Sequence, residues 1–324
     1  GSTAVDSALR LCQLASNIQG KPHRKQILTR EKAYHGSTFL SASVTGKERD
    51  KSAMDTIKEG IHFLSAPCHF YHPEFATEEA FCDFLIEELE QKILDVGADN
   101  IMCFIAEPIL ASGGVIVPPA NYNQRCWQTV KKYGITYIAD EVVTGFGRLG
   151  HWFASEAVFG VVPDMIIFAK GVTSGYIPMG GYAVSETFLA TFSGDNAEGC
   201  LYSNGYTWGG SPIACAAALT SWDIIERENL LTHVHQIGPY FQQQLRTLKN
   251  IPLVGDVRGQ GLMAAVEMTV EGRNEEDLLA KDYAIGDMVD QHCQQLGLLV
   301  RPFINICIIS PPLIITKQQV DELV

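Results

Sequence analysis

Two charged residues each follow a short apolar run near the middle of the chain. The runs are residues 135–139 and 165–169, and they are followed by Asp140 and Lys170. Runs of this length that are rich in β-branched and other apolar residues predict buried strands of an α/β sheet. Ligands of open α/β sheets bind at the carboxyl ends of the strands. We therefore expect a carboxylate and an amine to face one ligand.

The chemistry of Lys170 has two readings at this stage. An amine held against an apolar strand end tends to have a lowered pKa, which suits a lysine that reacts with carbonyl groups. The residues that follow it, 171–175, form a small, polar and flexible loop. The alternative is an ordinary solvated lysine at a strand end, because most lysines lie on protein surfaces. Spacing alone leaves both readings open.

A resemblance to a known family lies in two segments that contain these residues, DEVVTGFGR and PDMIIFAKGVTSGYIPMGG. They resemble the core signature of the class III aminotransferases, which are fold-type I enzymes that use pyridoxal 5'-phosphate (PLP). The resemblance implies that Lys170 holds PLP covalently, that Asp140 pairs with the pyridine nitrogen, and that Val142 packs against one face of the ring. A carboxylate suits this position because the ring withdraws electrons only while its nitrogen stays protonated.

The chain starts with a predicted amphipathic helix, and Ser2 or Thr3 suits its N-cap. Its apolar face repeats at helical spacing and consists of Val5, Ala8, Leu9, Cys12, Ala15 and Ile18. The start GSTAVDSALRL also resembles the family's phosphate-binding helix start. That resemblance implies that Gly1 and Ser2 bind the PLP phosphate and that a segment before Gly1 is missing. The alternative for Gly-Ser is a cloning scar.

The resemblance implies further cofactor contacts. Tyr34 would stack on the PLP ring with His35 close by, although such a pair taken alone is more often ordinary packing. Glu107 follows a predicted strand at residues 101–106 and would also lie near the cofactor. Thr207 would reach the PLP phosphate of a neighbouring subunit. The resemblance therefore implies a homodimer whose active sites are shared between subunits.

The substrate side of the site rests on Arg301, which by resemblance grips the substrate carboxylate, a task that suits a planar guanidinium. Ile304 stands where relatives often have glycine, a departure that bears on the mobility of Arg301. Ser112 stands where relatives acting on ornithine or 4-aminobutyrate carry a glutamate. Its presence favours the omega-amino acid:pyruvate group. Arg258 is interpreted as structural rather than catalytic.

Composition limits the other classes of function. The chain has 324 residues, 46% of them apolar, and a formal net charge of −13, which argues against nucleic acid as a partner. It contains neither a long apolar stretch nor a signal peptide, so we expect no membrane association. Nine scattered cysteines without a CxxC motif predict core thiols in a reducing cytoplasm. Surface or structural roles are favoured over metal binding for His62, His69 and His72.

These observations predict an α/β protein, and the resemblance implies fold type I. We expect a mostly parallel central sheet flanked by helices in residues 1–232 and a smaller α+β domain in residues 233–324. The predicted function is transfer of an amino group from an omega-amino acid or amine to a keto acid such as pyruvate. Two alternatives remain: another PLP enzyme of the same fold, such as an aminomutase or decarboxylase, and a non-catalytic remnant that only dimerises.

Overall fold

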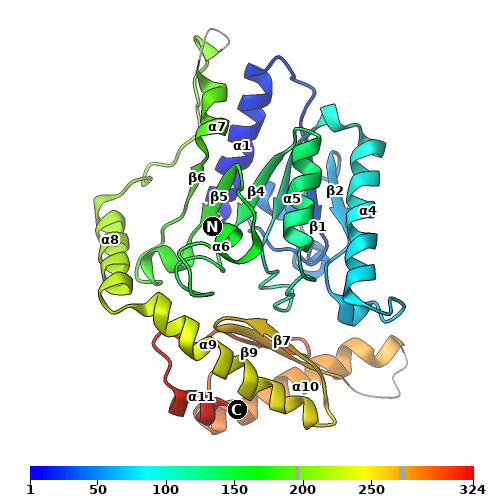
Figure 1. Ribbon diagram of the computed structural model, residues 1–324, viewed down its shortest axis with the longest axis vertical. Helices are drawn as coiled ribbons and strands as arrows, with labels where there is room; N and C mark the ends of the chain where they lie inside the picture. Colours follow the sequence, from blue (N-terminus) through cyan, green and yellow to red (C-terminus); the bar gives the residue numbers. More distant parts are fainter. Residues whose placement is uncertain (194–196, 270–274) are drawn as a thin grey trace.

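The computed structural model describes residues 1–193, 197–269 and 275–324. They form a larger body around one sheet and a smaller body around a second sheet, one above the other in Figure 1. The chain passes from the larger body to the smaller one through α9 (Leu230–Arg246). The boundary between residues 232 and 233 lies inside this helix, and the division into two domains stays a prediction.

The larger sheet is mostly parallel, as the sequence predicts. Its six strands lie in the order β2-β1-β3-β4-β5-β6. Strands β1 to β5 run parallel, and β6 pairs antiparallel with β5. The strands are β1 (Gln26–Arg30), β2 (Ile61–Leu64), β3 (Ile101–Ala106), β4 (Thr136–Asp140), β5 (Met165–Phe168) and β6 (Gly181–Val184).

Helices cover both faces of this sheet. Because side chains alternate along a strand, β3 sends Cys103 and Ile105 toward α1 (Ser2–Ile18) on one face. Phe104 and Ala106 point to the other face, which α4 (Glu78–Val96) and α5 (Tyr122–Lys132) cover. The predicted apolar face of the first helix is buried throughout. The sheet core is thus enclosed between two helical layers, which is typical of a parallel sheet.

The predicted N-cap of α1 is wrong. Gly1 is the N-cap, and no side chain caps the helix. Ser2 lies one residue inside the helix, and its hydroxyl accepts a hydrogen bond from the Ser37 N–H at 3.1 Å instead. The serine therefore ties α1 to the loop after β1 rather than closing its own helix.

The smaller sheet is antiparallel, with the order β7-β8-β10-β9. Its strands are β7 (Val254–Gln260), β8 (Met263–Met268), β9 (Arg301–Phe303) and β10 (Ile306–Ile309). One face packs against α9 through Val234 and Phe241. On the other face, Met263 and Ile306 pack with Ile109 of the larger body. This apolar interface fixes β9, and with it Arg301, relative to the larger sheet.

The other helices are short or peripheral. They are α2 (Phe39–Val44), α3 (Glu48–Lys51), α6 (Ala154–Phe159), α7 (Glu186–Leu189), α8 (Pro212–Arg227), α10 (Glu275–Gln295) and α11 (Lys317–Leu323). Within the described residues, no helix combines the length and apolar character needed to cross a bilayer. Six cysteines are buried, namely Cys12, Cys68, Cys82, Cys103, Cys126 and Cys307. This burial agrees with their interpretation as core thiols.

Candidate active site

The ends of four neighbouring parallel strands carry most of the predicted site residues. β2 and β3 lie on opposite sides of β1, so the strand order reverses there, and ligands of such sheets bind at this reversal. The carboxyl ends of β1, β3, β4 and β5 share one edge of the sheet. The structure brings five of the predicted residues to this edge: Tyr34, His35, Glu107, Asp140 and Lys170.

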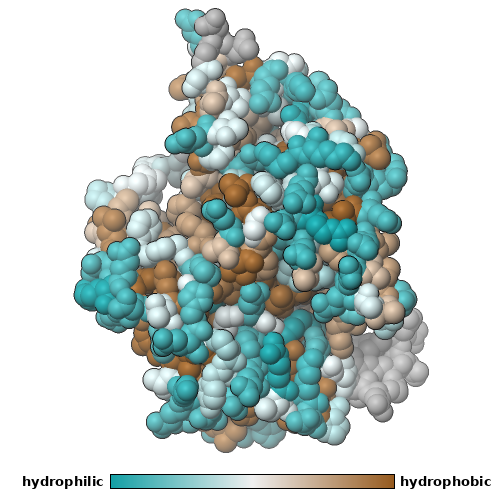
Figure 2. Space-filling view, viewed as in Figure 1, coloured by the Kyte–Doolittle hydropathy of each residue, from teal (hydrophilic) through white to brown (hydrophobic). Residues whose placement is uncertain are grey.

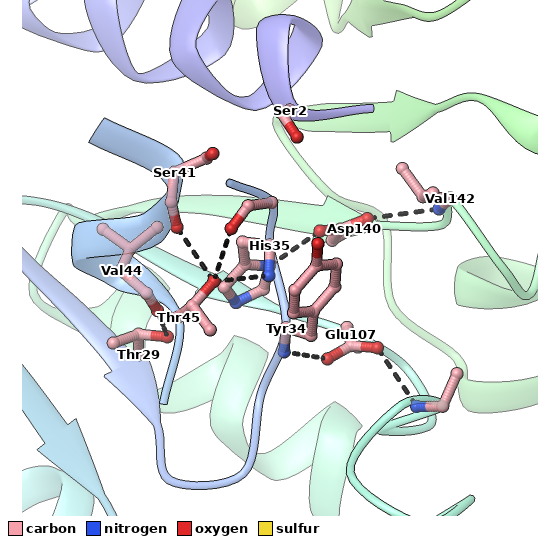
Figure 3. A network of polar contacts seen from close by, with 12 residues as sticks. Ser2, Thr29, Tyr34, His35, Ser41, Val44, Thr45, Glu107, Asp140 and Val142 are labelled. Atoms are coloured by element: carbon pink, nitrogen blue, oxygen red, sulfur yellow. Dashed lines mark hydrogen bonds and ion pairs between the residues drawn. The ribbon is translucent and has the colours of Figure 1, made fainter. Parts of the chain in front are cut away.

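Asp140 is the last residue of β4 and is 4% exposed. Its Oδ2 lies 2.7 Å from Nδ1 of His35, and its Oδ1 accepts a hydrogen bond from the Val142 N–H at 3.2 Å. His35 is itself fixed, since its N–H donates to the Thr45 hydroxyl at 3.0 Å. Figure 3 shows these contacts as one connected network. The carboxylate therefore has a set orientation at the strand end.

Glu107 follows β3 and is equally buried. Its Oε1 accepts a hydrogen bond from the Tyr34 N–H at 2.8 Å, and its Oε2 accepts one from the Ala111 N–H at 3.1 Å (Figure 3). Burial raises the pKa of Glu107, while the nearby His35 and the two N–H donors oppose that rise. Both carboxylate oxygens thus bind backbone N–H groups, and Glu107 fixes the position of the turn that carries Tyr34.

Lys170 lies just beyond β5 with φ of 38°, in the left-handed region that non-glycine residues rarely adopt. Such strain is commonest where surrounding structure imposes it at functional positions. Its ammonium makes no hydrogen bond or ion pair with any described residue, and solvent reaches the side chain. Burial by neighbouring atoms lowers its pKa, Asp140 and Glu107 raise it, and Arg301 lowers it further. These charges lie within electrostatic reach of one amine.

The N-terminal end of α1 also reaches this site. A Cβ on Gly1 would lie 3.7 Å from Val142 Cγ1 and 3.8 Å from Ala169 Cβ, so Gly1 packs beside both strand ends. Gly36 has φ of 138°, and a Cβ there would come within 2.5 Å of the Ser2 hydroxyl. Only glycine allows this close approach. The uncapped first turn of α1 therefore brings N–H groups and a positive helix end beside Val142.

Arg301 begins β9 and is exposed. Within the described part of the chain its guanidinium has neither a hydrogen bond nor an ion pair. Ile304, in the turn after β9, has φ of 59°, which is costly for a β-branched residue. A glycine at this position would relieve the strain, because glycine adopts positive φ without steric cost. The turn also lies against α10, where a Cβ on Gly286 would come 1.9 Å from the Ile304 carbonyl oxygen.

The other predicted residues fall outside this cluster. Thr207 is exposed in the loop before α8, and no hydrogen bond joins it to the cluster among the described residues. Arg258 pairs with Glu267 at 2.7 Å and Asp256 at 3.1 Å, which agrees with its structural interpretation. The described residues contain no group of three or more side chains that could hold a metal ion. Two of the histidines considered for metal binding contact protein side chains: His62 contacts Gln26, and His72 contacts Glu74.

Sequence reasoning missed Lys47, a buried cation near this edge. Lys47 is 9% exposed and donates a hydrogen bond to the Ser112 hydroxyl at 3.1 Å. It lies within electrostatic reach of Arg301. Its neighbours in the sequence, TGKERDK, are polar and predict an exposed turn, so no signal in the sequence marks the burial.

Comparison with known protein families shows to which family the chain belongs. The sequence model described as "Aminotransferase class-III" matches residues 1–324. The chain belongs to this family. Membership confirms the predicted family and the fold-type I architecture.

Several characterised proteins resemble the chain over its whole length. It is 36% identical to "Gamma aminobutyrate transaminase 1, mitochondrial" of Solanum lycopersicum and covers 63% of that protein. It is 38% identical to the putrescine–pyruvate aminotransferase of Pseudomonas aeruginosa and covers 70% of it. The chain thus spans less than two thirds of the plant relative.

Solved structures agree with these matches. An (S)-enantioselective omega-transaminase from Thermomicrobium roseum superposes with a TM-score of 0.92 at 35% identity. The comparison covers all of this chain and 71% of that one. A structure described as "Transaminase with L-ala" gives a TM-score of 0.93 at 36% identity, with 76% of that chain covered.

Proposed function

We propose that the protein transfers an amino group from an omega-amino acid or a simple amine to a keto acid such as pyruvate, with PLP as cofactor. The observation that carries the proposal is the placement of Lys170. Its ammonium has a lowered pKa and lacks a hydrogen-bonding partner among the described residues. It lies within electrostatic reach of the buried carboxylates of Asp140 and Glu107. Membership in the class III family supports the same reaction.

The residues at the sheet edge suit each chemical group of PLP. An amine for the aldehyde comes from Lys170, and a carboxylate for the pyridine nitrogen comes from Asp140. An aromatic ring and an aliphatic side chain for the two ring faces come from Tyr34 and Val142. The uncapped start of α1, with Gly1 and the Ser2 hydroxyl, offers donors to a phosphate. His35 Nε2 is buried without a partner among the described residues, so the ring acts on Asp140 through Nδ1 alone.

Each side chain has one task in the proposed reaction. When bound, PLP supplies an aldehyde that captures amines and a ring that accepts electrons from the substrate carbon. Lys170 Nζ would hold the cofactor and, once released by an amine substrate, would carry the proton removed from the substrate carbon. Asp140 would keep the ring nitrogen protonated, and His35 keeps Asp140 oriented. Glu107 holds the Tyr34 turn in place.

Arg301 is proposed to bind the keto acid carboxylate. A guanidinium without a protein partner remains available for a bidentate contact. Its location on β9 would let the smaller body complete the site formed by the larger one. Ser112 offers no carboxylate that would hold Arg301 when no acid is present.

We also propose a homodimer in the cytoplasm, with Thr207 contacting the phosphate held by the neighbouring subunit. Large apolar side chains are strongly exposed between residues 201 and 222, including Leu201, Trp208, Ile213 and Leu219. Apolar surface also gathers across the middle of the face shown in Figure 2. Patches of this kind commonly mark protein interfaces. The affinity for PLP is measured over a range of protein concentrations. An affinity that rises as concentration favours the dimer, and that no longer rises in Thr207→Ala, would support this assembly.

The reaction itself is tested with the full-length protein loaded with PLP. 4-Aminobutyrate or putrescine serves as donor and pyruvate as acceptor, and alanine formation is followed by chromatography. Alanine formed in equal amount to the donor consumed supports amino transfer. Release of carbon dioxide, or a rearranged amine formed without keto acid, would show a decarboxylase or an aminomutase instead.

A further inference from the structure

A group of positive side chains surrounds the start of β9, although the chain carries a net charge of −13. Lys47 and Arg49 come from the start of α3, and Arg301 comes from β9. Asp50 is the carboxylate that pairs with two of them, at 2.9 Å from Lys47 and 3.4 Å from Arg49. Two cations therefore share one carboxylate, and Arg301 adds a third positive charge within electrostatic reach of Lys47.

The aromatic ring of Phe303 holds two of these cations in place. Lys47 Nζ lies 4.1 Å from its centroid, and the Arg49 guanidinium lies 4.4 Å from it. Lys47 Nζ also lies 5.6 Å from the centre of the Tyr34 ring. Lys47 thus lies between the aromatic ring at the β1 end and the strand that carries Arg301.

Burial makes Lys47 unusual among these cations. Burial lowers the pKa of Lys47, Asp50 raises it, and the charges of Arg49 and Arg301 lower it. A nearly buried ammonium loses much of its hydration, so it gains strongly from an anion that enters the site. Lys47 donates a hydrogen bond to the Ser112 hydroxyl and pairs with Asp50 at 2.9 Å. Asp50 also pairs with Arg49, and Arg301 acts on Lys47 as a further positive charge, so the group as a whole keeps an excess of positive charge.

We propose that Lys47 binds a substrate carboxylate remote from the reacting carbon, as a second cation beside Arg301. The inference rests on the proposed aminotransferase function and narrows its substrates. Two substrate classes carry such a group: dicarboxylic 2-keto acids as acceptors and omega-amino acids as donors. Arg301 would bind the carboxylate next to the keto carbon, and Lys47 the remote one.

The test uses full-length, PLP-loaded protein with Lys47→Met, which keeps the length of the side chain and removes its charge. Two substrate pairs are compared by kcat/KM: 2-oxoglutarate with pyruvate, and 4-aminobutyrate with butylamine. In at least one pair we expect a loss of roughly 10- to 100-fold for the member that carries the remote carboxylate, and less than about twofold for the member that lacks it. The affected pair identifies the source of the remote carboxylate. Lys47→Arg should retain most of the preference.

Lys51→Met is the matched control. Lys51 lies on the same short helix, 4.2 Å from the Phe63 ring, and pairs with Glu48 at 3.8 Å. It should change neither pair. Equal losses within both pairs for Lys47→Met, or no loss, would overturn the inference.

A binding measurement separates this inference from the proposed reaction. Calorimetry with glutarate, an unreactive dicarboxylate, and with propionate needs no turnover. We expect Lys47→Met to weaken glutarate binding by roughly tenfold or more while propionate binding stays the same. Unchanged glutarate binding would overturn the role of Lys47 even if the enzyme transfers amino groups. A wild-type protein that binds glutarate through Lys47 but aminates no keto acid would instead contradict the proposed function.

Discussion

The carboxylate side and the cation side of the candidate site differ in how their side chains are held. Asp140 and Glu107 are buried, and every carboxylate oxygen has a hydrogen-bonding partner. Lys170 and Arg301 reach solvent, and their charged groups have no hydrogen bond or ion pair with the described residues. The difference matches the tasks proposed for each side. Groups that set the electronics of a cofactor gain from a fixed position, whereas groups that exchange partners during turnover must stay free.

The largest effect is expected when the amine of Lys170 is removed. Lys170→Ala should lower turnover by more than the roughly 10²–10⁴-fold expected for acid–base catalysis alone, because covalent holding is lost as well. The measurement is alanine formation from an amine donor and pyruvate. Added methylamine should restore part of the rate. Wild-type turnover in the variant would assign the reacting amine to another lysine.

Asp140→Asn tests the fixed side. An amide cannot keep the pyridine nitrogen protonated, so proton transfer should slow by roughly 10²–10³-fold while PLP stays bound. Single-turnover kinetics and equilibrium dialysis measure the two quantities separately. Loss of PLP with little change in the rate per bound cofactor would mean that Asp140 acts in binding only.

Arg301→Ala tests the second cation in the comparison. Loss of a charge-assisted bidentate contact should cost roughly 2–4 kcal/mol, tens- to several-hundred-fold in kcat/KM. The loss should fall on the pyruvate half-reaction and spare a simple amine donor. Equal losses in the two half-reactions would indicate a structural role for Arg301. No loss in either would leave it as a surface residue beside Pro302.

The smallest effect concerns the pKa of Lys170. Its neutral amine reacts with carbonyl reagents, so a lowered pKa moves the onset of labelling to lower pH than for an ordinary lysine. Glu107 raises this pKa, so Glu107→Gln should shift the labelling midpoint to still lower pH. Arg301 lowers it, so Arg301→Ala should shift the midpoint upward. Rates of labelling across pH, read by mass spectrometry, give both directions. Shifts of the opposite sign would place these charges elsewhere.

The placement of several candidate site residues could be predicted because buried parallel strands are recognisable in the sequence as short apolar runs. Apolar runs ending at Asp140, Lys170 and Glu107 define strands, and parallel strands bring their ends to one edge. The hydrogen-bond network that orients Asp140 could be predicted only in part from the sequence. A resemblance places His35 nearby, but its contact with Asp140 depends on how Thr45 holds the turn.

Other features depend on tertiary packing that no local pattern records. The sequence predicts Ser2 as a helix cap. In the structure Gly36 lies close to the Ser2 hydroxyl, which accepts a hydrogen bond from the Ser37 N–H instead. Lys47 lies in a polar stretch, yet Phe303 and Tyr34 cover it from distant parts of the chain. Packing of the smaller body against the larger one creates this environment, so sequence spacing near Lys47 carries no trace of it.

The central claim is that Lys170 is the amine that holds PLP. The direct measurement is borohydride reduction of the PLP-loaded full-length protein, followed by peptide mapping. We predict one stoichiometric pyridoxyl label on the peptide that contains Lys170, and none on that containing Lys47. A label on any other lysine, or no stable label on a protein that binds PLP, would contradict the account.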